Sequence, residues 1–384
     1  MKYKEKTIII FLALLIGTIS YFGFLKGFYS IDTERILSQG YFNYAINDAY
    51  IKDGRIFSAL IFGTIGKVMP YVNLKIIYII NIVIAICILS IATLEMYKII
   101  NNYMKKTDIK SKGISFLLSS TYIFSCMQVD SMQFIDSFVI CTSVLLFIIS
   151  LKQTVILKNN KKGFIIALIS VFCYQGSIPM YIATAFLFTL LENKKFSFKF
   201  LKTIIMCAIN IITVSIINLL FVNIVPHVLG FTLTDRIENV NYIEKFIQNV
   251  NGYFNMICGN DGYFPKYVML TISVIIITIS IFNKNKTIVI NVLCIFLTYI
   301  ASGLVMIPLS ISERTLLPLG EIVSAMLIYT YCNFNEMHKN SYNILKILIL
   351  VFFSLNLINN IYLTEQFMEA QKIDKIFAKE KKKN

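Results

Sequence analysis

The stretch "VNLKIIYIINIVIAICILSIATLEMY", from Val72 to Tyr97, has no charged residue between Lys75 and Glu95. An α-helix rises about 1.5 Å per residue, so a run of this length crosses the roughly 30 Å hydrocarbon core of a bilayer. Within lipid, a helix is the structure in which one segment satisfies its own backbone hydrogen bonds. The stretch therefore predicts a membrane-spanning helix.

The composition extends this prediction to the whole chain. Its 384 residues are 57% hydrophobic and only 15% charged, which a soluble domain of this size does not normally sustain. Comparable apolar runs recur along almost the entire sequence, so we expect an all-α polytopic membrane protein, with residues 1–384 forming one unit. Eleven spans are predicted, near 7–25, 72–97, 113–128, 133–151, 163–175, 178–191, 203–225, 267–282, 287–307, 315–332 and 344–362.

The distribution of basic residues predicts the orientation. With the N-terminus in the cytoplasm, the inner linkers hold more than half of the 36 Lys and Arg residues, as the positive-inside rule requires. A twelfth span at 56–70 would invert every later linker, so we expect that stretch to be a re-entrant or interfacial helix. The outer side then carries two long loops, 26–71 and 226–266, and a C-terminal tail, 363–384. The second loop contains "LTDRIENVNYIEKFIQNVNGYF" (233–254), a pattern typical of an amphipathic interfacial helix.

Several function classes are excluded by what the sequence lacks. The net charge of +15 follows from the basic inner linkers, so it requires no nucleic acid partner. Eight cysteines and two histidines form no CxxC motif and no Cys/His cluster, which argues against a zinc site or a disulfide framework. The chain also has no Gly-rich phosphate loop or Rossmann pattern for a nucleotide.

Charged groups beside spans are energetically costly and are therefore candidates for function. On spacing alone, "IDTER" (31–35) and "DGR" (53–55) also fit solvated turns, and Glu313 and Arg314 also fit a turn cap. Glu321 lies within the next predicted span and needs a partner. The outer-side candidates are Asp32, Glu34, Arg35, Asp53, Arg55, Asp130, Asp136 and Arg314.

An enzyme with its site on the outer face has no cytosolic nucleotide sugar available, so an activated donor would have to arrive within the bilayer. A polyprenyl phosphate or diphosphate carrier meets this requirement. Arginines at the interface, such as Arg55 and Arg314, would hold its phosphate through charge-assisted contacts. A carboxylate would deprotonate an acceptor hydroxyl or bind a divalent metal ion.

The first outer loop resembles the GtrII-type bacterial membrane glucosyltransferases. The likeness rests on "IDTER", then Gly40 and an aromatic residue, then "DGR" leading into an apolar stretch. The charged "SERTLLPLG" (312–320) agrees with it. The resemblance implies a GT-C-like fold and a hexosyltransferase that moves glucose, or a related hexose, from undecaprenyl phosphate to a surface polysaccharide, as in O-antigen modification.

The resemblance also implies roles for individual residues. Asp32 matches the catalytic or metal-binding acid, with Arg35 beside it, and "DGR" matches a contact to the donor phosphate. Ile31 stands where the family often has another Asp, so the role of the acid falls to Asp32 or Glu34. We therefore expect Asp32, Glu34 and Asp53 to be catalytic and Arg35 and Arg55 to bind substrate. Asp130, Asp136 and Arg314 are also expected to bind substrate, because the predicted topology places them on the same side of the membrane.

The expected surroundings follow from these roles. No metal site is assigned, although Asp32 and Glu34 could hold Mg²⁺ or Mn²⁺. The expected partners are a lipid-linked sugar donor, a polysaccharide acceptor, and a donor synthase and flippase, all at the cell (plasma or inner) membrane with the active site facing outside. Two alternatives stay open, namely a flippase or transporter of lipid-linked saccharides and a polysaccharide polymerase.

Overall fold

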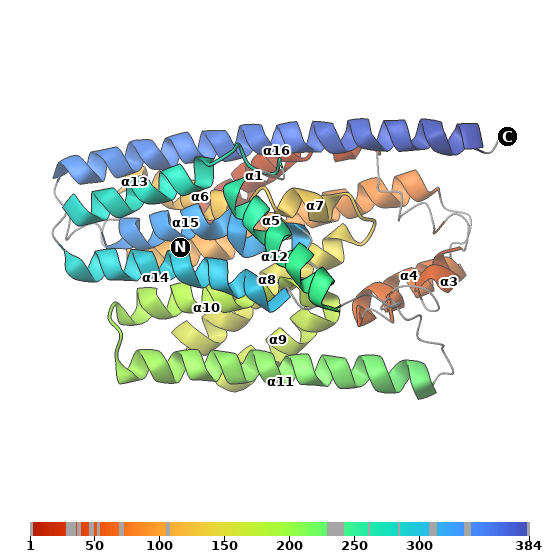
Figure 1. The fold of residues 1–384 in the computed structure, drawn as a ribbon, viewed down its shortest axis with the longest axis horizontal. Coiled ribbons are helices and arrows are strands. Elements are labelled where there is room, and N and C mark those ends of the chain that lie inside the picture. The colour runs from red at the N-terminus through yellow and green to blue at the C-terminus, as the bar shows by residue number, and fades with distance from the viewer. Residues whose placement is uncertain are drawn as a thin grey trace.

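The computed structural model describes residues 3–27, 36, 40–45, 50–51, 54–68, 73–104, 108–228, 242–259, 262–282, 285–306, 313–333 and 339–381. Within these ranges every regular element is helical and no β-strand occurs. Figure 1 shows the long helices α11, α14 and α16 lying roughly along the long axis of the molecule. The predicted all-α class is confirmed.

Each of the eleven predicted segments contains a helix. The short additional helices are α3 (Tyr41–Asn43), α4 (Ile56–Val68), α7 (Gln128–Met132) and α12 (Tyr242–Cys258). The helices that match the predicted segments are α1 (Tyr3–Ser20), α5 (Leu74–Tyr103), α6 (Ile109–Ile123), α8 (Ser137–Leu151), α9 (Asn160–Cys173), α10 (Ile178–Asn193), α11 (Phe198–Val228), α13 (Val268–Phe282), α14 (Lys286–Gly303), α15 (Leu317–Cys332) and α16 (Lys339–Lys381).

Among the described residues, five helical stretches are long and apolar enough to cross a membrane. They lie in α5, α8, α11, α14 and α16, and they are the basis for treating the protein as an α-helical membrane protein. The helix α4 has 13 residues and extends only about 20 Å at 1.5 Å per residue. The predicted spans in α6, α9 and α13 are only one or two residues longer, so the number of spans and the orientation stay predictions.

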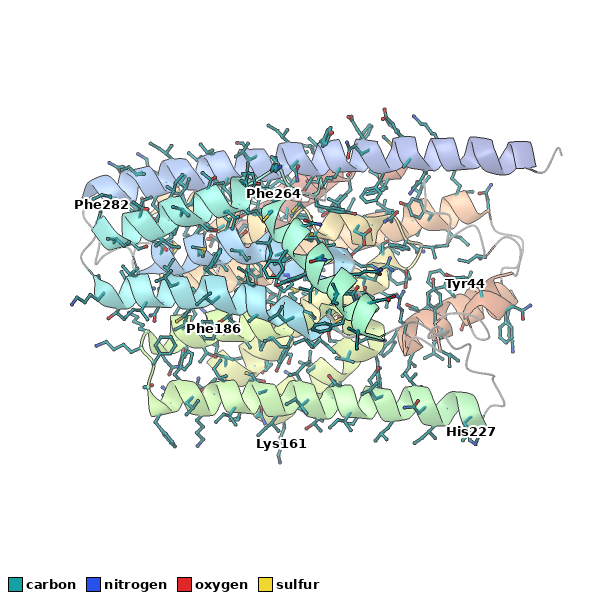
Figure 2. The ribbon with its side chains drawn as sticks, viewed as in Figure 1. Tyr44, Lys161, Phe186, His227, Phe264 and Phe282 are labelled. Atoms are coloured by element: carbon teal, nitrogen blue, oxygen red, sulfur yellow. The ribbon has the colours of Figure 1, made fainter. Side chains whose placement is uncertain are left out.

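The surface of the bundle is apolar where lipid would contact it. Figure 2 shows side chains projecting from α11 on the side away from the other helices. Ile209 and Ile212 of α11 are 57% and 58% exposed. The described part of the predicted amphipathic segment, 242–254, lies in the helix α12, which crosses the bundle obliquely in Figure 1. Residues 233–241 lie outside the described residues. One side of α12 is exposed at Ile243, whereas Tyr253 is fully buried.

The last predicted span ends at 362, but the helix that contains it extends further. The helix α16 continues without a break from Lys339 to Lys381, so residues 363–381 are helical. Leu363 and Met368 are buried and Thr364 donates a hydrogen bond to the backbone oxygen of Ser20 at 3.0 Å. Thr364 and Met368 pack against the start of the chain, near Ser20 and Gly23, and these contacts stabilise the helix beyond the end of its apolar run.

The contact between α8 and α9 depends on small residues. Ser143 and Ser170 hydrogen-bond to one another at 3.0 Å, and Ser150 Oγ donates to the backbone oxygen of Gly163 at 2.7 Å. Such close backbone approach is typical of helix pairs in membranes. A Cβ atom at Gly163 would overlap Thr154 Oγ1 and lie 3.0 Å from the Ser150 backbone oxygen.

We therefore expect Gly163→Ala to lower the free energy of unfolding by about 1–3 kcal/mol, the usual range for overpacking a tight contact. Thermal unfolding in detergent would measure the loss. Gly113→Ala, in α6, is the matched control because no atom lies within 4 Å of the new Cβ, and it should be neutral or slightly stabilising. Equal melting temperatures for the two variants would contradict this prediction.

Candidate functional site

Two carboxylates lie at the connection between α6 and α8. Asp130 is in the one-turn helix α7, and Asp136 is the N-cap residue of α8. Asp130 is 5% exposed and Asp136 is 2% exposed. Buried carboxylates need charged or hydrogen-bonding partners. The hairpin is therefore a packed part of the bundle and not a solvated turn.

Asp136 is paired with the arginine of "DGR". Arg55 Nη1 lies 3.1 Å from Asp136 Oδ2, and Ser58 Oγ donates to the same oxygen at 3.3 Å. Arg55 directly precedes α4 and Ser58 lies in its first turn, so these contacts attach the start of α4 to the N-terminus of α8. The Arg55 guanidinium also lies 5.0 Å from the centre of the Tyr174 ring, within cation–π range.

Asp130 is held by the turn that precedes α15. The backbone N–H of Arg314 donates to Asp130 Oδ2 at 3.3 Å, the Gln133 amide donates to Oδ1, and the Tyr263 side chain also hydrogen-bonds to this carboxylate. The Arg314 guanidinium stacks on Phe134 with 4.0 Å between Cζ and the ring centre. Burial raises the pKa of Asp130, although the positive charge of Arg314 opposes the rise.

Tyr174 lies between the Arg55–Asp136 pair and the Asp130–Arg314 contacts. Its side chain is within electrostatic range of Arg55, Arg314, Asp130 and Asp136, and it is buried. It stands at the break between α9 and α10, where the single 3₁₀ turn Gln175–Ser177 separates the helices. We call Arg55, Asp130, Asp136, Tyr174 and Arg314 the charged cluster.

The structure brings together four of the residues expected to bind substrate. Arg55, Asp130, Asp136 and Arg314 all belong to the charged cluster, although they come from three separate parts of the sequence. Gly54, next to Arg55, has a positive φ of +70° and its backbone oxygen accepts a hydrogen bond from Asn218 of α11 at 3.2 Å. The expected residues Asp32, Glu34, Arg35 and Asp53 lie outside the described residues.

Tyr174 is absent from the residues predicted above, although Gly176 and Pro179 follow it closely in the sequence. The signal was available, because a tyrosine beside a helix break places a polar tip at a helix end. Ser58, Gln133, Phe134 and Tyr263 were also missed, since nothing in their spacing links them to a distant carboxylate.

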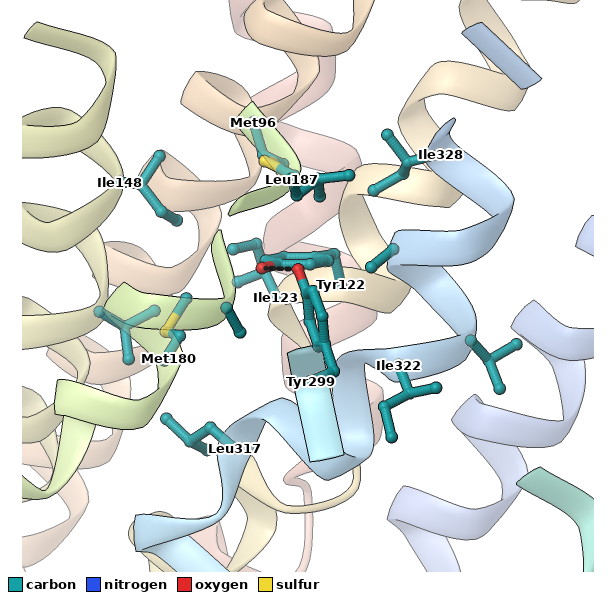
Figure 3. Close-up of a cluster of buried hydrophobic side chains, with 14 of the residues drawn as sticks. Met96, Tyr122, Ile123, Ile148, Met180, Leu187, Tyr299, Leu317, Ile322 and Ile328 are labelled. Atoms are coloured by element: carbon teal, nitrogen blue, oxygen red, sulfur yellow. Dashed lines mark hydrogen bonds between the residues drawn. The ribbon is translucent and has the colours of Figure 1, made fainter. Parts of the chain in front are cut away.

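A third buried acid lies in α15, where all residues of the helix are buried. Glu321 is 2% exposed and hydrogen-bonds through its side chain to Tyr122 of α6. The Tyr122 hydroxyl also hydrogen-bonds to Thr184 at 2.6 Å and to Tyr299 at 2.8 Å. Figure 3 shows Tyr122 and Tyr299 joined in this way among apolar side chains such as Met180, Leu187 and Ile322. Glu321 thus has one partner in Tyr122, whereas its Oε2 oxygen is buried without a hydrogen-bond partner among the described residues.

The charged cluster offers cations and carboxylates at one place, a combination that can bind a phosphate ester and move a proton. In the part of the chain that the structure describes, no group of three His, Cys, Asp or Glu side chains could hold a metal ion. The possible ligands Asp32 and Glu34 are outside that part. Comparisons with protein-family models, curated proteins and solved structures found no match to this chain.

Proposed function

We propose that the protein is an integral membrane glycosyltransferase that moves a hexose, such as glucose, from a polyprenyl phosphate carrier to a surface polysaccharide. The observation that supports this proposal is the charged cluster, in which two arginines, two buried carboxylates and Tyr174 meet beside the end of the "DGR" segment. The resemblance of the first loop to GtrII-type transferases adds the donor class. A GT-C-like arrangement with the site on the outer face belongs to the same proposal.

The proposed reaction gives roles to the two arginines of the cluster and to a carboxylate of the first loop. Arg55 and Arg314 hold the donor phosphate through charge-assisted hydrogen bonds. An acceptor hydroxyl attacks the anomeric carbon as the bond from that carbon to the phosphate oxygen breaks, and the phosphate leaves with the electron pair. A carboxylate takes the hydroxyl proton, and Asp32, Glu34 and Asp53 are the proposed candidates. A Mg²⁺ or Mn²⁺ ion bound by Asp32 or Glu34 would neutralise charge on the leaving phosphate.

The direct test uses the full-length protein in nanodiscs with radiolabelled glucosyl undecaprenyl phosphate and cell-wall polysaccharide. The expected result is transfer of label to the polysaccharide. If glucose fails, the same assay is repeated with other hexoses on the same carrier. No transfer with any hexose would rule out the proposed enzyme.

We expect Asp32→Asn to abolish transfer while protein yield and melting temperature stay unchanged, because the amide cannot accept the proton. Comparing label transfer among Asp32→Asn, Glu34→Gln and Asp53→Asn identifies which carboxylate is the general base. Full activity of the Asp32 variant would move the role to whichever of the other two variants is inactive. Glu365→Gln, an exposed position on α16, is the control for a neutral loss of charge.

A second candidate is a flippase or transporter of lipid-linked saccharides. The buried Glu321 and its hydrogen-bonded partners favour it, since ionisable groups inside a helix bundle often belong to a transport path. Translocation of a fluorescent lipid-linked sugar in proteoliposomes, without transfer to polysaccharide, would support this candidate over the enzyme. Glu321→Gln should then stop translocation.

A further inference from the structure

A basic pocket lies at the other end of α5 from the charged cluster. Tyr78, near the start of α5, donates a hydrogen bond to the backbone oxygen of Met132 at 2.9 Å, which places that end of the helix beside the cluster. Lys98 is twenty residues further along α5, or about 30 Å away at 1.5 Å per residue. The pocket has a volume of about 460 Å³ and is lined by Glu5, Lys6, Lys98, Asn101, Asn102, Lys112 and Lys152.

Carboxylates fix three of the four lysines in place. Glu95 of α5 pairs with Lys152 at 2.7 Å and with Lys98, while Glu5 of α1 pairs with Lys112 of α6 at 3.0 Å. Glu5 also accepts a hydrogen bond from the Tyr97 hydroxyl at 2.9 Å. The side chains of Lys98 and Lys152 are only 27% and 24% exposed. Their ammonium groups are therefore held in position before any ligand binds.

The pairs do not cancel the positive charge. Four lysines (6, 98, 112 and 152) and two glutamates (5 and 95) leave the group with a formal charge of +2. Asn101 and Asn102 add amide donors to the lining. A pocket with fixed ammonium groups and amide donors has the chemistry to bind an anion with several oxygen acceptors, as a phosphate ester has.

The position of the pocket identifies the source of that anion. Exposed apolar side chains occur within about two turns of it, at Ile8 of α1 (49% exposed) and Ile91 of α5 (41% exposed). The pocket therefore opens where an apolar helix surface gives way to charged helix ends. In a bilayer this boundary is the level of the lipid phosphates.

We propose that this pocket binds the phosphate group of an anionic membrane lipid. The lysines contact the phosphate oxygens, and the acyl chains lie along the exposed faces of α1 and α5. The bound lipid would join α1, α5, α6 and α8 at this end of the bundle. This site is independent of the proposed transferase reaction.

Native mass spectrometry of the full-length protein tests the proposal, with phosphatidylglycerol and phosphatidylcholine offered in equal amounts. Wild type should retain phosphatidylglycerol preferentially. Lys6→Glu breaks none of the ion pairs described above and should reduce this retention by about tenfold, whereas Lys98→Gln with Lys152→Gln should reduce it by more than tenfold. Lys161→Gln with Lys162→Gln, two exposed lysines outside the pocket, is the matched control and should retain the lipid as wild type does.

A second arm separates a lipid from a soluble anion. Calorimetric titration with inorganic phosphate in neutral detergent should give no binding comparable to that of the lipid. Binding of phosphate without retention of phosphatidylglycerol would overturn the lipid as the source. Equal retention of phosphatidylglycerol by wild type and Lys6→Glu would overturn the site itself, since Lys6→Glu keeps the described ion pairs intact.

Discussion

Asp136→Asn is expected to lower both stability and transfer activity strongly. The substitution leaves the Arg55 guanidinium, which is 16% exposed, without the carboxylate that lies 3.1 Å from it. Breaking one side of a buried ion pair typically costs about 3–5 kcal/mol. Arg55 would also lose the contact that orients it toward the donor phosphate, and a displacement of about 1 Å at a reacting site can reduce the rate about 10²-fold.

A double variant separates the two losses. Arg55→Met with Asp136→Leu removes both charges and keeps apolar volume at the contact, so its melting temperature should recover toward that of wild type. Its transfer activity should stay as low as that of Asp136→Asn, because the phosphate contact is gone. If the double variant is less stable than Asp136→Asn, then Asp136 does not stabilise the protein by pairing with Arg55.

The helical part of the fold could be predicted well because long apolar runs have few alternatives in a membrane. All eleven predicted segments contain helices, and the amphipathic pattern at 233–254 predicted most of α12. The end of α16 could not be predicted in the same way. Residues such as Glu365 and Lys372 are charged and suggest a solvated tail, but Leu363, Thr364 and Met368 pack against other parts of the chain.

The candidate site could be predicted only by residue type. Charge is rare in this chain, so Arg55, Asp130, Asp136 and Arg314 stand out from the sequence alone. Their pairing could not be inferred, because Arg55 and Asp136 are 81 positions apart and no local spacing connects them. Tyr174 illustrates the same limit, since its importance depends on four charged residues that the folded bundle brings around it.

Asp130 should make stability depend on pH, because its burial outweighs its ionic contacts and raises its pKa. The folded protein then keeps the Asp130 proton to a higher pH than the unfolded chain does, starting from the ordinary value of 3.8. Its contribution to stability is fully present below that value and is lost as the pH rises through the folded pKa. Asparagine does not ionise, so the Asp130→Asn variant lacks this pH dependence.

The melting temperature of Asp130→Asn relative to wild type should therefore rise as the pH increases from about 4, until Asp130 is ionised in the folded protein. Over the same range, transfer by wild type should increase with pH, since the ionised carboxylate positions Arg314 through its backbone hydrogen bond and its charge. The variant should show at least a tenfold loss of kcat/KM, or about 1.4 kcal/mol, carried mainly by a higher KM for the lipid-linked donor.

Melting curves and transfer assays at matched pH test both parts of this prediction. Parallel changes of melting temperature with pH in wild type and Asp130→Asn would show that Asp130 does not titrate as its burial requires. A loss of kcat with an unchanged KM would contradict a positioning role, because a carboxylate that acts on the reacting hydroxyl lowers the rate of the chemical step instead. Asp130 would then join Asp32, Glu34 and Asp53 as a candidate for the general base.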